Sequence, residues 1–212
     1  MKTRETYHIL LVLIVLIFAV ILKPFLTNQD YNVMLIAATS ITLAVLINIA
    51  TKKITAYYFE TSIEHKIWSV DRYWLRRKDT FKNKIPFGIL IPFIATIASL
   101  GNFLFLAALE FDIKTLTSRV SKRHEWYKFT DITDFHLGVI AASGVILNLV
   151  FAVIGYLAGF SLFAKLNIYY AFYCMLPLWN LDGTKIFFAN KNIWAVLGAI
   201  VIIFLLYALF LP

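Results

Sequence analysis

Cysteine and charge are both scarce in this chain of 212 residues, which has one cysteine and only 15% charged residues. The single cysteine, Cys174, excludes an internal disulfide and any metal site built from a cluster of thiolates. The sequence has no glycine-rich phosphate loop and no Gly-x-Ser-x-Gly element, so neither nucleotide binding through such a loop nor a serine nucleophile on such a turn is supported. Internal repeats and low-complexity tracts are also missing.

Hydrophobic residues dominate what is present, at 61% of the chain, with 17% aromatic residues and a mean hydropathy of +0.78. This is well above the roughly half-apolar composition of soluble domains. Several apolar runs reach the roughly 20 residues that a helix needs to cross a bilayer. We therefore predict an all-α, polytopic integral membrane protein that forms a single membrane domain over residues 1–212. Its six expected membrane segments are 9–22, 31–50, 87–109, 137–164, 168–178 and 193–211.

The net charge of +8 comes from 20 basic and 12 acidic residues, and the position of these charges predicts what they contact. They crowd beside the apolar segments, which is the pattern that sets membrane topology. Basic and aromatic residues are interleaved over residues 68–84, a combination that suits an anionic lipid surface. The expected partner is the lipid bilayer, and nucleic acid is not expected.

Counting lysines and arginines predicts the orientation, because cytoplasmic loops carry an excess of them. A cytoplasmic N-terminus makes 51–85 and 110–135 cytoplasmic basic loops, provided that 87–109 does not cross the membrane. The Gly101-Asn102 pair interrupts that run, so we predict a re-entrant hairpin there, which is allowed where protein buries the backbone. Only Lys23 and Lys165 of the twenty cations then face outward. The predicted location is the cell membrane.

Asp182 is an acidic residue set in a strongly apolar region, within the stretch Pro-Leu-Trp-Asn-Leu-Asp-Gly that begins at Pro177. A carboxylate at membrane depth is costly unless it faces a cavity, a partner charge or a metal, so Asp182 is a candidate functional residue. The alternative is that Asp182 caps a helix at the membrane interface without any chemical role.

Three features of this region occur together. The Pro177 stretch fits a Pro-x-x-x-Leu-Asp-Gly pattern, Gly144 and Asn148 form a Gly-x-x-x-Asn element, and a long helix followed by a turn separates the two. In these features the chain resembles the site-2 protease family, zinc metallopeptidases that cut substrates within the membrane. The resemblance implies a site-2 protease-like core in which Asp182 is the third zinc ligand. It also implies a substrate groove, formed by Gly144, Asn148, Pro177, Asn180 and Gly183.

The catalytic signature of that family, His-Glu-x-x-His, is missing. In the signature, two histidines four apart on one helix face bind zinc and the glutamate is the general base. The four histidines here are His8, His65, His124 and His136. The preferred alignment places Asn48 and Lys52 at the two ligand positions and Ile49 at the base. A second alignment keeps His65 as one ligand, after Thr61 and Ser62, and also lacks the base.

The preferred alignment leads to a structural hypothesis about Lys52. A protonated amine cannot bind zinc, but it can pair with a carboxylate, so we predict that Lys52 fills the metal position with a salt bridge to Asp182. Cys174 is expected to be a small buried residue. Asn148 is interpreted either as a residue that forms hydrogen bonds between helices or as a substrate contact. His136 is interpreted as part of a helix cap, and His65 with Glu60 and Glu64 as a solvated face.

The function expected from these features is that of a pseudoenzyme, a site-2 protease-like (peptidase M50-like) metalloprotease homologue without catalysis. It would bind or regulate transmembrane helices of other proteins and need no cofactor. Two alternatives stay open. The first is an active intramembrane metallopeptidase with atypical zinc ligands, and the second is a transporter with a site around Asp182.

Overall fold

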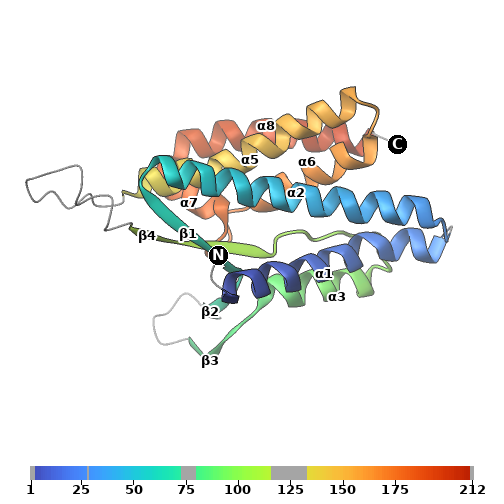
Figure 1. Ribbon diagram of the computed structural model, residues 1–212, viewed down its shortest axis with the longest axis horizontal. Coiled ribbons are helices and arrows are strands. Elements are labelled where there is room, and N and C mark those ends of the chain that lie inside the picture. Colours follow the sequence, from blue (N-terminus) through green and yellow to red (C-terminus); the bar gives the residue numbers. More distant parts are fainter. Residues whose placement is uncertain (1–2, 28, 73–79, 116–132, 211–212) are drawn as a thin grey trace, which may run out of the picture.

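A computed structural model describes residues 3–27, 29–72, 80–115 and 133–210 (Figure 1). Most of this part of the chain is helical, as expected from its composition. Its elements in chain order are α1 (Thr3–Thr27), α2 (Tyr31–Tyr58), β1 (Thr61–Ile67), β2 (Val70–Arg72), β3 (Thr80–Ile85), α3 (Phe87–Ala98), β4 (Leu109–Thr115), α5 (Asp134–Leu157), α6 (Ser161–Met175), α7 (Asp182–Ala189) and α8 (Lys191–Phe210).

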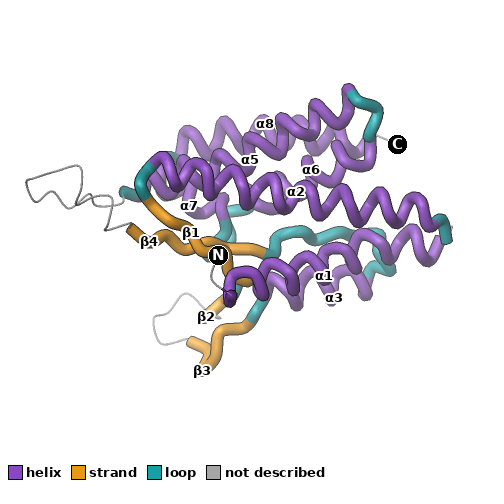
Figure 2. The backbone as a smooth tube through the Cα atoms, viewed as in Figure 1, coloured by secondary structure: helices purple, strands orange, loops and turns teal. Residues whose placement is uncertain are grey.

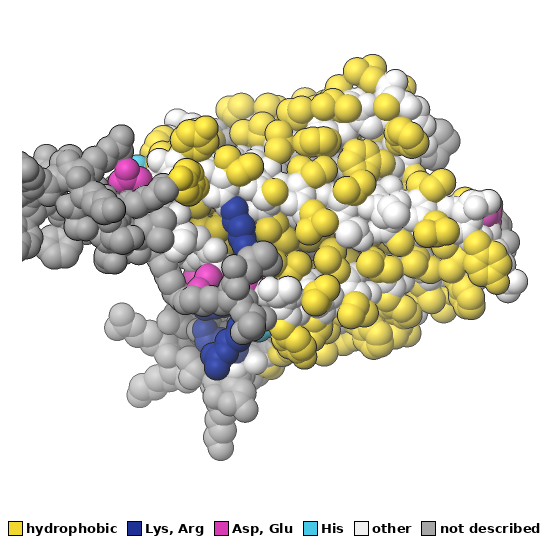
Figure 3. Space-filling view, viewed as in Figure 1, with side chains coloured by type: hydrophobic (Ala, Val, Ile, Leu, Met, Phe, Trp, Pro, Cys, Tyr) yellow, Lys and Arg dark blue, Asp and Glu magenta, His cyan; other side chains and the backbone are white. Residues whose placement is uncertain are grey.

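Four helices of the described chain, α1, α2, α5 and α8, are long and apolar enough to cross a membrane. Hydrophobic side chains cover most of the face drawn in Figure 3, and most of its visible charged side chains gather at the end where the strands lie. The prediction of a helical, multi-pass membrane protein is confirmed at this level. The complete set of six membrane segments stays a prediction.

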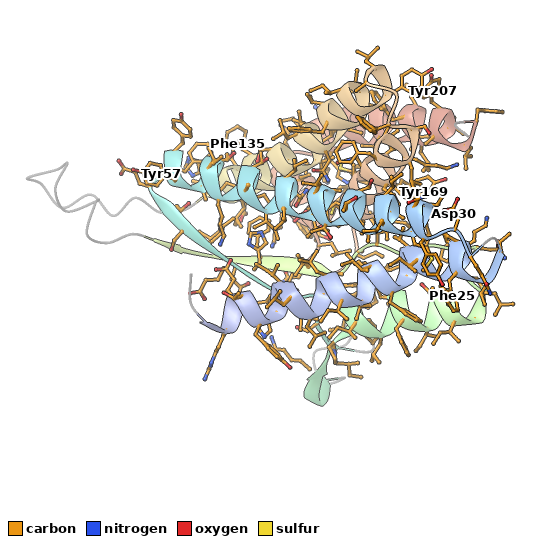
Figure 4. All side chains as sticks on the ribbon, turned by 45° about the vertical axis from the view of Figure 1, so that its right-hand side comes forward. Phe25, Asp30, Tyr57, Phe135, Tyr169 and Tyr207 are labelled. Carbon is orange, nitrogen blue, oxygen red and sulfur yellow. The ribbon has the colours of Figure 1, made fainter. Side chains whose placement is uncertain are left out.

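The helices are arranged around α2. One side of α2 packs against α1, which in turn contacts α3, and the other side packs against α5 and α6. Figure 1 shows α1 and α3 on one side of α2, with α5, α6 and α8 on the other. In Figure 4 Asp30, before α2, lies at the opposite end of the molecule from Tyr57, which lies near Phe135 at the start of α5. Helices α2 and α5 are therefore antiparallel.

The turn between α5 and α6 lies earlier than predicted. The sequence led us to expect one segment over 137–164 and another over 168–178, but α5 ends at Leu157 and α6 begins at Ser161. Gly159 adopts a φ of 83° in the intervening turn, a conformation that glycine tolerates and other residues rarely do. Just before this turn, Gly155 of α5 lets α6 approach closely, because a Cβ there would lie 2.5 Å from the ring of Phe163.

The segment over 87–109 folds back on itself. Helix α3 ends near Leu100 and Gly101, both with positive φ (51° and 78°), and the chain then returns through residues 104–108 without regular secondary structure. Trp68 joins the two ends of this segment, because its N–H donates to the Ala108 carbonyl and its carbonyl accepts from the Gly88 N–H. The segment therefore starts and finishes at the same place in the fold.

The described chain also contains four strands, so the prediction of an all-α protein was incomplete (Figure 2). Strand β1 pairs antiparallel with β4, and β2 with β3. In β1 the residues Thr61, Ile63 and His65 alternate with less buried neighbours, which is the period-two pattern of a strand with one buried face. Parts of the predicted loops 51–85 and 110–135 therefore form two small two-stranded sheets.

Candidate functional site

The centre of the site is an ion pair between Lys52 of α2 and Asp182 at the start of α7. The side chains of Lys52 and Asp182 are only 4% and 2% exposed. Removing one partner of a buried pair leaves an uncompensated charge, so each residue depends on the other. The predicted pairing of Lys52 with Asp182 is confirmed. Asp182 is also the first residue of α7, so the alternative, in which it sits at a helix end without a chemical role, stays open.

Two glycines allow the helices that carry this pair to approach. A Cβ on Gly144 of α5 would lie 2.7 Å from both Asn48 Nδ2 and Lys52 Cε. A Cβ on Gly183 would lie 2.0 Å from the Met175 carbonyl oxygen at the end of α6. Because real Cβ atoms do not approach other atoms this closely, glycine at 144 makes room for the α2 side chains, and glycine at 183 lets α7 begin against α6.

Asn148 lies one turn after Gly144 on α5 and is fully buried. Neither polar atom of its amide has a hydrogen-bond partner among the described residues, and the same holds for Asn48 Nδ2 and Asp182 Oδ1. Buried polar atoms normally find a partner in the protein, in ordered water or in a ligand. The site thus offers both donors and acceptors, which suits groups that have both, such as a peptide backbone.

His65 lies at the site, and its interpretation as part of a solvated face was wrong. Its side chain on β1 is 1% exposed, and its Nδ1 lies 3.3 Å from the Glu5 carboxylate of α1. Burial, helped by the charge of nearby Lys52, lowers the pKa of His65 to about 4. The imidazole is therefore neutral at pH 7. Its Nε2 has no partner among the described residues.

A second lysine, Lys185, enters the site from α7. Its ammonium donates to the Phe111 carbonyl of β4 and lies 3.5 Å from the centre of the Phe111 ring, while the Lys52 ammonium lies 5.4 Å from the same ring. Burial lowers the pKa of Lys185 to about 8, although the negative charge of Asp182 opposes this shift. One amine therefore binds the Asp182 carboxylate and a second lies near enough to feel its charge, and an aromatic ring lies against both amines.

The remaining predicted residues divide into buried and exposed ones. Cys174 is buried on α6, as expected, and its thiol interacts with Asp182. Pro177 and Asn180 lie exposed on the loop before α7, whereas Gly183 is buried. His136 forms a capping box with Thr133 at the start of α5, as predicted. The structure therefore gathers Asn48, Lys52, Gly144 and Asp182, and it leaves Pro177 and Asn180 at the rim.

The sequence interpretation missed Glu5, Phe111 and Lys185. The Glu5 carboxylate also pairs with Lys53 at 2.7 Å, and its 5% exposure is unusual for an acidic residue. Hydrophobic alternation in β1 and β4 was a signal for the strand that carries Phe111. No local signal pointed to Glu5, because its partners lie 48 and 60 positions away in the chain.

The residues at positions 48 and 52 do not fit zinc. Within the described ranges, no three histidine, cysteine, aspartate or glutamate side chains are grouped so that they could hold a metal ion. The amine of Lys52 instead binds the carboxylate that would serve as ligand. An amide at position 48 and a protonated amine at position 52 offer no equivalent of two neutral imidazoles.

The fold and the site define a helical membrane protein with a buried charged centre between α2, α5 and α7. Comparisons of the chain with protein-family models, with curated proteins and with solved structures find no match. The resemblance to site-2 proteases therefore depends on the motif residues alone.

Proposed function

We propose that this protein is a pseudoprotease, a multi-pass membrane protein that resembles site-2 intramembrane metalloproteases but does not catalyse proteolysis. It uses the region between α2, α5 and α7 to bind or regulate membrane segments of other proteins. The observation that supports this proposal best is the buried ion pair, because Lys52 and Asp182 are the residues that the alignment assigns to two zinc ligands. The unpartnered Nδ2 of Asn48 and both polar atoms of the Asn148 amide would bind a segment that enters between these buried helices.

The proposal includes an orientation in the cell membrane. The N-terminus and the sheet lie on the cytoplasmic side, and α3 with its returning chain forms a re-entrant hairpin. The concentration of charged side chains at the sheet end of the molecule supports this orientation (Figure 3), because basic residues are retained on the cytoplasmic side. The fold-back of 87–109 onto Trp68 supports the hairpin.

Metal analysis tests the loss of the zinc site. We expect the purified protein to contain no stoichiometric zinc. A triple variant with Asn48→His, Ile49→Glu and Lys52→His creates the His-Glu-x-x-His signature on α2. We expect this variant to bind one zinc per chain. Adding Asp182→Asn to the triple variant is the matched control and should abolish that binding. Zinc in the wild-type protein that disappears in Asp182→Ala would overturn the proposal, as would cleavage of a transmembrane test substrate.

Photo-crosslinking tests the proposed binding of membrane segments. A photoreactive phenylalanine analogue at position 148 should crosslink to a co-expressed single-span test protein. The same analogue at position 150 is the matched control, because Val150 is on the same helix and 44% exposed on the outer surface. Equal crosslinking from both positions would mean contact through the bilayer alone and would reject the proposal.

One observation favours the metallopeptidase alternative. Glu5 binds Nδ1 of His65, which leaves Nε2 free, and a carboxylate behind an imidazole is the usual support of a metal-binding histidine. This alternative predicts that the wild-type protein holds zinc that is lost in both His65→Ala and Asp182→Ala.

A further inference from the structure

Five aromatic side chains form a cluster beside the buried ion pair, which we call the aromatic clasp. Trp68 is its centre, with ring centroids 6.1, 6.4 and 6.2 Å from those of Phe87, Phe105 and Trp179. Phe87 and Trp179 also pack edge to face at 6.2 Å, and Phe105 lies 4.8 Å from Tyr173. The clasp therefore joins α3 and its returning chain to α6 and to the loop before α7.

The clasp lies against the site through two short links in the chain. Leu181 packs in the same hydrophobic cluster as Trp68, and Asp182 is the next residue. Tyr173 is followed directly by Cys174, whose thiol interacts with Asp182. Movement of the loop before α7 would therefore change the surroundings of both Asp182 and Cys174.

Trp179 is the member of the clasp that is held under strain. Its φ is +43°, and the left-handed region is unfavourable for a residue with a Cβ. Its side chain is nevertheless 49% exposed, so the contacts with Trp68 and Phe87 keep it in place without full burial. Backbone strain of this kind persists only where surrounding contacts enforce it and is concentrated at moving or functional segments.

Trp68 adds a second unfavourable feature to the closed arrangement. It is 1% exposed, and its Nε1 has no hydrogen-bond partner among the described residues. A buried N–H without a partner is costly. Withdrawal of Trp179 would allow water to reach the Trp68 indole and would let the backbone at position 179 relax. Both changes lower the free energy of opening, while the lost ring contacts raise it.

We propose that the aromatic clasp is a gate, and that withdrawal of Trp179 opens the Lys52–Asp182 site to an incoming segment. The proposal deepens the proposed function and rests on it for the identity of the occupant. In the closed state the loop before α7 seals the ion pair against α3 and its returning chain. A membrane segment that enters between these elements replaces the ring contacts of Trp179 with its own.

The single cysteine supplies a direct measurement of opening, because Cys174 is buried beside Asp182. The experiment follows the rate at which N-ethylmaleimide modifies Cys174 in the full-length protein in detergent, normalised to the rate in the denatured chain. We expect slow modification of the wild-type protein. Phe87→Ala removes two ring contacts and keeps the strained backbone, so it should accelerate modification by about tenfold, the effect of losing one or two aromatic pairs.

Two variants at position 179 separate the effect of the ring contacts from the effect of the backbone strain. Trp179→Gly removes the ring and the strain together, so we expect an increase smaller than that of Phe87→Ala. Trp179→Phe retains an aromatic ring and should stay within about twofold of the wild-type rate. Phe188→Ala is the matched control, since it removes a 74% exposed ring that pairs with Phe187 on α7, outside the clasp. It should leave the rate unchanged.

Equal rates in the wild-type, Phe87→Ala and Trp179→Gly proteins would overturn the gate. An increase of the same size in Phe188→Ala would also overturn it, because it would indicate general loosening of α7. Thiol labelling requires no bound segment. A failure to open therefore rejects this inference alone, whereas missing crosslinks at position 148 reject the proposed function alone.

Discussion

Replacing Lys52 by methionine should destabilise the protein strongly, because it leaves Asp182 buried without its partner charge. Methionine matches the length of the lysine stem, so the loss of packing is small. Breaking one side of a buried ion pair costs about 3–5 kcal/mol, and the 2% exposure of the Asp182 side chain puts this pair in that class. We therefore expect Lys52→Met to lose about 3–5 kcal/mol of unfolding free energy.

A double-mutant cycle isolates the interaction from the individual side chains. Lys52→Met with Asp182→Leu removes both charges together, and we expect it to be within about 2 kcal/mol of the wild-type protein, since apolar replacement of a whole buried pair is often neutral. The assay is denaturant or thermal unfolding in detergent micelles. Lys66→Met is the matched control. Lys66 pairs with Asp112, and the two side chains are 43% and 44% exposed, so its loss should cost about 1 kcal/mol or less.

Two outcomes would refute this reasoning. A cost below about 1 kcal/mol for Lys52→Met would mean that the pair contributes no more than a surface ion pair. Simple addition of the two single costs in the double variant would mean that the two residues are not coupled.

Three further predictions follow from the same geometry. Gly183→Ala should cost about 3 kcal/mol or more and exceed Gly144→Ala, measured by unfolding, because its Cβ would meet backbone rather than flexible side chains. As pH falls from about 6.5 towards 4, unfolding takes up a proton at His65, so stability should drop by up to about 3 kcal/mol. This drop should be smaller in His65→Gln, measured as the unfolding midpoint at several pH values. A zinc chelator should leave the midpoint of the wild-type protein unchanged; a clear decrease would contradict the proposed loss of the zinc site.

Hydropathy was enough to predict the membrane helices, because the thickness of a bilayer fixes both the length and the apolar character of a spanning helix. It was less successful at the turn between α5 and α6. There the apolar run continues through Gly159 and only the backbone conformation marks the break. The strands were missed because their alternating residues lie inside segments whose basic charges predicted cytoplasmic loops.

The ion pair could be predicted because a family pattern assigns positions 52 and 182 to one site. The contact between Glu5 and His65 could not be predicted, because nothing in the sequence around either residue indicates that they meet. His65 lies between Glu64 and Lys66, which resembles a solvated face when β1 is not recognised as a strand. Once β1 pairs with β4, His65 is opposite Phe111 and on the buried side of the sheet.

The charges at the site offer a balance for the Asp182 carboxylate that requires no metal. In the zinc enzymes that the chain resembles, a divalent cation would balance the carboxylate at the position of Asp182. Here the Lys52 amine binds the carboxylate and the Lys185 amine adds a second positive charge nearby, and both lie against Phe111. The pKa of Lys185, about 8, keeps most of the second charge at neutral pH. The net charge of the centre is then close to that of a divalent metal with one aspartate. Under the proposed function, such a replacement would keep α2 and α7 together after the loss of the chemistry, which is the combination that a binding scaffold requires.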